Sequence, residues 1–175
     1  MWTEAKTSEQ SRKYIERSES IANFGSRAEI LARLQANWRS RETLYSKKAD
    51  LIEGGATLAF KEETIKSLDT NISRLSKSIS LLESGLQKQY QQQANDMLEA
   101  GDITGLRTWL ARLQAGAGTG NEEFDKGTAA TVKEALKKAE KKDAERVKEL
   151  EDARADFRTS QADRIALKGK DWTYF

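Results

Sequence analysis

The chain has 175 residues and a net charge of +2, with 33% charged and 7% aromatic residues and neither Pro, Cys nor His. Without Cys and His, the sequence excludes disulfide frameworks, thiolate nucleophiles, Cys/His zinc sites and Ser-His-Asp triads. We therefore expect a protein that is not an enzyme and that uses no cofactor, metal or small-molecule substrate. A chain of this length usually carries about nine prolines, so their absence favours long helices and predicts an all-α fold.

Two helices are expected in the first third of the chain. Residues 5–22 predict a short, weakly amphipathic helix. Ser26 and Glu29 then match a capping box, in which the serine hydroxyl accepts a hydrogen bond from a first-turn amide. A second helix is therefore expected over 27–53, where a glycine pair ends it. Its apolar residues repeat at seven-residue spacing and are expected to pack against a neighbouring helix: Leu31, Trp38, Tyr45 and Ile52.

The clearest repeat in the sequence predicts a long third helix over 57–100. Isoleucine or leucine recurs every seven residues, and a leucine follows three residues later in most repeats, as at the a and d positions of a coiled coil. The expected core residues are Leu58, Ile65, Leu68, Ile72, Leu75, Ile79, Leu82 and Leu86. The residue before each inner a position is small and uncharged, which is typical of a helix with neighbours on several sides. We therefore expect this helix to be central.

Two further helices are expected after the third. A short one is predicted over 103–114, and the glycines after it predict a flexible hinge over 116–127. Thr131 and Glu134 match a second capping box, so a last helix is expected over 129–168. Its apolar residues are sparse, which favours a position on the outside of the molecule.

The chain ends in an aromatic tail. Gly169 is expected to end the last helix, which separates the tail, residues 169–175, from one helical domain over 1–168. The domain is predicted to be an elongated antiparallel helical bundle or coiled coil with three long helices and two short ones. Aromatic side chains dominate many interfaces, so the tail is expected either to pack back on the bundle or to anchor a partner through Trp172, Tyr174 and Phe175.

Basic residues of the second helix suggest an alternative. Cations interleaved with Trp38 and Tyr45 resemble the surfaces that bind single-stranded nucleic acid. Contacts would then come from the basic faces of helices 27–53 and 129–168, beginning with Arg33, Arg39, Arg41, Lys47 and Lys48. The small net charge and the seven-residue spacing of the aromatic residues favour packing over nucleic-acid binding.

The preferred functional hypothesis is a non-catalytic structural or assembly protein. It would act as a coiled-coil interaction module that joins copies of itself or protein partners, as in a virion, a tail or a secretion machine. A nucleic-acid-associated helical protein is the alternative, and a membrane-active helical bundle is the third hypothesis. The sequence contains neither a signal peptide nor an apolar run near the ~18 residues that span a bilayer. We therefore expect a cytoplasmic protein, free or incorporated into a particle.

Overall fold

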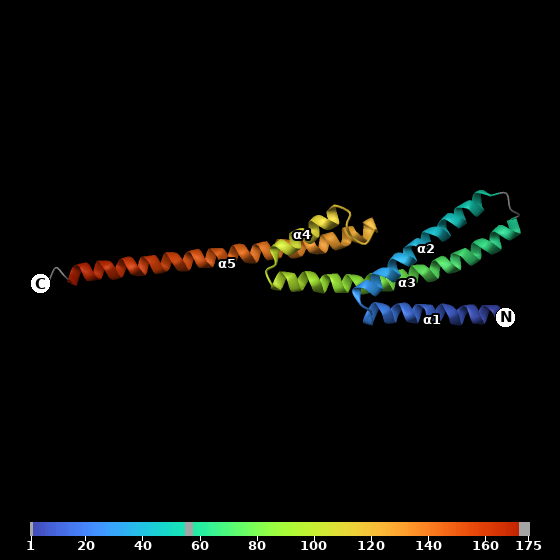
Figure 1. The fold of residues 1–175 in the computed structure, drawn as a ribbon, viewed down its shortest axis with the longest axis horizontal. Coiled ribbons are helices and arrows are strands. Elements are labelled where there is room, and N and C mark those ends of the chain that lie inside the picture. The colour runs from blue at the N-terminus through green and yellow to red at the C-terminus, as the bar shows by residue number, and fades with distance from the viewer. Residues whose placement is uncertain (1, 55–57, 172–175) are drawn as a thin grey trace.

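The computed structural model describes residues 2–54 and 58–171, with side chains from 8 to 54 and from 59 to 168. Within these residues the prediction of an all-helical chain is confirmed, since they form five helices and no strand. Successive helices reverse direction along a strongly elongated molecule (Figure 1). The helices are α1 (Trp2–Phe24), α2 (Arg27–Glu53), α3 (Leu58–Glu99), α4 (Ile103–Gln114) and α5 (Glu122–Asp171).

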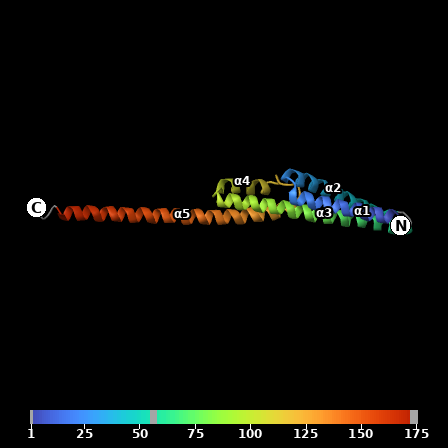
Figure 2. The same ribbon diagram turned by 90° about the horizontal axis from the view of Figure 1, so that it is seen from below.

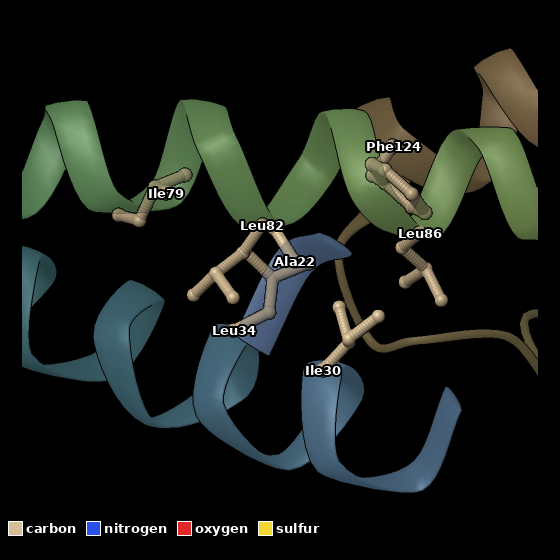
Figure 3. Packing of buried hydrophobic residues seen from close by; sticks show 7 residues of the cluster. All are labelled: Ala22, Ile30, Leu34, Ile79, Leu82, Leu86 and Phe124. Carbon is tan, nitrogen blue, oxygen red and sulfur yellow. The ribbon is translucent and has the colours of Figure 1, made fainter. Parts of the chain in front are cut away.

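Helix α3 packs against all four other helices. Helices α1 and α2 lie beside its first part, and α4 and the beginning of α5 lie beside its second part (Figure 1). Where these groups meet, α1, α2 and α5 all contribute to one apolar cluster around α3 (Figure 3). Its buried residues are Ala22, Ile30, Leu34, Ile79, Leu82, Leu86 and Phe124.

The predicted core row of α3 becomes more buried along the helix. Ile65 and Leu68 are half-buried, whereas the later members of the row are buried: Ile72, Leu75, Ile79, Leu82 and Leu86. Burial increases toward the part of α3 that lies in the apolar cluster, because three other helices contribute side chains there (Figure 3). The side chain of Leu58 lies outside the described residues.

Helix α2 packs against its neighbours through only part of the predicted row. The expected residues Tyr45 and Ile52 are 51% and 55% exposed. The buried residues of α2 are instead Ile30, Leu34 and Asn37, and the half-buried ones that continue their spacing are Arg41, Leu44, Lys48 and Leu51. The prediction is confirmed for Leu31 and Trp38, which are half-buried and pack against the apolar cluster. It is wrong for Tyr45 and Ile52, because polar side chains interrupt the row that packs on α3 and leave an adjacent row with a cleaner apolar repeat.

The polar residues of this interface form a closed hydrogen-bond network. The Tyr14 hydroxyl of α1 donates to Asn37 Oδ1 (2.8 Å), and Asn37 Nδ2 donates to Ser78 Oγ of α3 (2.8 Å). Ser18 Oγ donates to the Tyr14 carbonyl (3.0 Å), which leaves the Ser78 hydroxyl to donate to Ser18 Oγ at 2.6 Å. These buried hydroxyl and amide groups find their partners only when α1, α2 and α3 are aligned in this way along their axes. The network therefore fixes the register of the three helices.

Helix α5 begins at Glu122, inside the predicted hinge 116–127. Asn121 Oδ1 accepts a hydrogen bond from the Phe124 amide (3.0 Å), which caps the first turn. Asp125 Oδ1 accepts bonds from the Thr119 amide (2.9 Å) and hydroxyl (2.7 Å). The turn before α5 is therefore held by defined hydrogen bonds, and left-handed backbone occurs in it at Gly116 and Gly120.

Two other predicted boundaries of the last helix also differ from the structure. Thr131, predicted to cap a helix, lies inside α5, where its hydroxyl donates to the Gly127 carbonyl (3.3 Å). At the other end, α5 continues through Gly169 to Asp171. A glycine in a helix costs only about 1 kcal/mol relative to alanine, so it does not by itself end one.

Candidate interaction surface on the last helix

Helix α5 has two halves in different environments. In the first half, Val132, Ala135 and Ala139 are at most 5% exposed and pack against α3 and α4. After Asp143, which is half-buried, every described side chain is exposed. Two perpendicular views agree that this second half extends alone beyond the other helices (Figures 1 and 2). We call residues 143–168 the arm.

An aromatic cluster anchors the beginning of α5. The Phe124 ring lies 5.8 Å from the Trp38 ring of α2 and 6.4 Å from the Tyr90 ring of α3, centroid to centroid. Tyr90 also contacts the Trp109 ring of α4 at 5.7 Å. Because four helices meet in this cluster, the direction of α5 is set before the arm begins.

Tyr90 is the titratable residue of this aromatic cluster, and its pKa is shifted. Burial raises the pKa of its hydroxyl, the nearby Arg27 guanidinium lowers it, and Asp125 raises it again. The net shift is upward. The Arg27 guanidinium lies over the Tyr90 ring, 5.2 Å from its centroid.

An ion pair joins α4 to α5. Arg107 Nη2 of α4 donates to Glu140 Oε1 at 2.9 Å. Both side chains are about half exposed, so the pair contributes little stability. Farther along, α5 extends past the ends of α3 and α4 (Figure 1). The buried side chains of α5 therefore all lie before the arm.

The apolar stripe of α5 continues along the arm. From Val132 onward, steps of three or four residues keep one face of the helix. In the first half this face is Val132, Leu136 and Ala139, which are buried or half-buried. In the arm the same steps reach four large apolar residues that are 44%, 54%, 63% and 71% exposed: Val147, Leu150, Phe157 and Ile165.

The charges of the arm nearly balance. Seven acidic residues lie between 143 and 168, namely Asp143, Glu145, Glu149, Glu151, Asp152, Asp156 and Asp163. Six basic residues lie in the same range, namely Arg146, Lys148, Arg154, Arg158, Arg164 and Lys168. The arm is therefore a nearly neutral helix with an exposed apolar stripe, and this stripe is the strongest candidate site among the described residues.

The five basic residues predicted to contact nucleic acid do not form one free surface. The Arg33 guanidinium lies 5.4 Å from the centroid of the Tyr14 ring. Lys48 Nζ forms an ion pair with Asp69 at 2.7 Å, and Arg41 Nη1 reaches Ser76 Oγ at 3.5 Å. The other two, Arg39 and Lys47, are exposed.

The predicted interaction tail, Trp172, Tyr174 and Phe175, lies outside the described residues. Sequence reasoning identified the tail but did not single out the arm. The available signal was the stripe itself, because large apolar residues in the arm continue the spacing of Val132 and Leu136 through a charged sequence.

Comparisons with protein-family models, curated proteins and solved structures gave no match for this chain. Among the described helices, none is both long enough and apolar enough to cross a membrane.

Proposed function

We propose that this chain is a non-catalytic structural or assembly protein, a coiled-coil module that joins a homo-oligomer or a larger complex through the arm of α5. The observation that carries the proposal is the stripe from Val132 to Ile165, whose apolar residues are buried or half-buried in its first part and exposed in the second, where Asp143, Arg154 and Gln161 lie between them. Burial of large apolar side chains is favourable, so a partner that covers this row of exposed side chains would gain binding free energy.

The rest of the chain supports this proposal as a scaffold. An elongated antiparallel bundle, built around α3 and fixed in register by the network of Tyr14, Ser18, Asn37 and Ser78, would hold the arm away from the body. The aromatic residues that follow α5 in the sequence would add further anchoring side chains. Such a module fits a cytoplasmic protein or a component of a particle.

Nucleic-acid association has weaker support. Three of the five candidate basic side chains interact with α1 or α3. The arm, which is the most accessible part of the chain, carries balanced charge, whereas nucleic-acid affinity depends on accumulated positive charge. A membrane-surface role is also weakly supported, because basic residues do not dominate the polar face of the arm.

The test is the size of the protein in extracts of the cells that naturally make it. We expect the native chain to sediment in a complex larger than its own 19.7 kDa. The double variant Leu150→Asp/Phe157→Asp should sediment as a monomer, because both changes place a charge on the exposed stripe. Tyr45→Asp, at a similarly exposed aromatic residue of α2, should behave like the native chain. A native chain that is monomeric in the extract would contradict the proposal.

A further inference from the structure

We propose that the arm binds the arm of a second copy of this chain, with the two helices antiparallel and overlapped over residues 143–168. This inference rests on the proposed function, because it names the partner of the same surface. At 1.5 Å per residue the overlap is about 39 Å long. Two-fold symmetry makes each contact in such a pair occur twice.

Continuity with an interface inside the chain supports a helical partner. The face of α5 that continues into the arm is covered in its first half by helices α3 and α4. Where those helices end, the same face continues with exposed apolar side chains, among them Val147, Leu150 and Phe157. A helix laid along the arm would therefore extend packing that the chain already forms, and the arm of a second copy offers the same stripe in return.

The charges on the stripe distinguish between the two orientations. Asp143 and Arg154 lie on the stripe, because they fall at the same three- and four-residue steps as Val147 and Leu150. A parallel pair in register would place each of these charged residues opposite its own copy, and like charges facing each other destabilise an interface.

The antiparallel overlap replaces these repulsive pairs with favourable ones. It places Asp143 of each copy opposite Lys168 of the other, which are oppositely charged. It also places Arg154 opposite Phe157, where the guanidinium is able to stack on the ring. Val147 and Ile165 come to lie next to each other, so apolar contact is kept near both ends.

The chain already uses the contact proposed for Arg154 and Phe157. The guanidinium of Arg27 lies over the Tyr90 ring, and those of Arg33 and Arg74 lie 5.4 Å and 5.5 Å from the centroid of the Tyr14 ring. Arginine on an aromatic ring thus recurs in its helix contacts, and a symmetric arm pair would add two more.

The first experiment measures the mass of the purified full chain by sedimentation equilibrium over a wide range of concentrations. We expect a reversible monomer–dimer equilibrium. Phe157→Ala should weaken it at least about thirtyfold, because an aromatic anchor typically contributes 2 kcal/mol or more and 1.4 kcal/mol is tenfold. Tyr45→Ala should leave the equilibrium unchanged. A chain that is monomeric at every concentration would overturn the inference.

The second experiment determines the orientation, and it exploits the absence of native cysteine. The single-cysteine variants Leu150→Cys and Gln161→Cys are mixed in equal amounts and mildly oxidised, and the disulfides are identified by peptide mass. The antiparallel overlap brings these two positions opposite each other, so the mixed disulfide should predominate. Predominance of disulfides between identical positions would indicate a parallel pair and overturn the proposed arrangement.

The two proposals fail in different ways. If the purified chain stays monomeric while the extract holds a complex that Leu150→Asp/Phe157→Asp disrupts, the arm binds a different partner. The inference then fails and the proposed function stands. If neither preparation contains a complex, both fail.

Discussion

The two halves of α5 share one helix and one stripe but differ in what covers them. In the first half small and medium side chains, such as Ala135 and Ala139, are buried against α3 and α4. In the arm the apolar side chains of the stripe, such as Leu150 and Phe157, are exposed. Burial of apolar area is the main favourable term in folding. The first half therefore contributes to the stability of the isolated chain. The apolar area of the arm does not, because it is buried only when the arm associates with a partner.

The largest expected difference between buried and exposed regions is in leucine truncation. Leu82→Ala, at a fully buried site between three helices, should lower the free energy of unfolding by about 3–5 kcal/mol through lost burial and a remaining cavity. Leu150→Ala in the arm should change it by no more than about 0.5 kcal/mol when the protein is monomeric. Urea unfolding of both variants at low protein concentration checks the comparison. Equal losses would mean that the arm is covered by its own chain.

A smaller effect is expected from the polar network that aligns the first three helices. Asn37→Ala removes the acceptor of the Tyr14 hydroxyl and the amide that donates to Ser78 Oγ. It should therefore cost about 1–3 kcal/mol, the usual penalty for buried polar groups left unpaired. Thr108→Ala is a suitable control, because that exposed hydroxyl of α4 bonds only within its own helix. An Asn37→Ala variant as stable as the native chain would show that the network does not hold the helices together.

The smallest expected effect concerns pH at the aromatic cluster that anchors the beginning of α5. The pKa of Tyr90 is raised above its ordinary value of 10.0, chiefly by burial. As the pH rises past 10, the unfolded chain therefore loses this proton before the folded chain does, and the folded state becomes less stable. Tyr90→Phe should lessen the fall in unfolding free energy between about pH 9.5 and 11, whereas Tyr45→Phe, at an exposed residue of α2, should not. Identical alkaline profiles for the native chain and Tyr90→Phe would contradict this account.

The sequence was most informative where apolar residues form uninterrupted repeats. The row from Ile72 to Leu86 gave a buried face of α3, and its small neighbours Ser78 and Gly85 indicated helices on more than one side. Both are buried, and an added Cβ on Gly85 would lie 2.5 Å from the Ala22 carbonyl oxygen of α1. Close backbone approach of this kind requires glycine.

Other features depended on tertiary partners that a sequence does not name. Asn37 and Lys48 look like surface residues until Ser78 and Asp69 of α3 are placed opposite them. The start of α5 was missed because the glycines before it suggested a hinge, although Asn121 followed by acidic residues is also a helix start signal. Whether the arm is covered depends on where α3 and α4 end in space, which periodicity does not determine.

The most direct test of the central claim is amide hydrogen exchange along α5 at two protein concentrations. At a concentration where the purified chain is monomeric, amides of residues 126–140 should be strongly protected, and those of the arm should exchange within about an order of magnitude of the unfolded rate. At a concentration where the chain associates, protection should spread along the arm while that of residues 126–140 stays the same. Arm amides that are equally protected at both concentrations, or that remain unprotected in the associated protein, would contradict the claim that the arm is the surface of assembly.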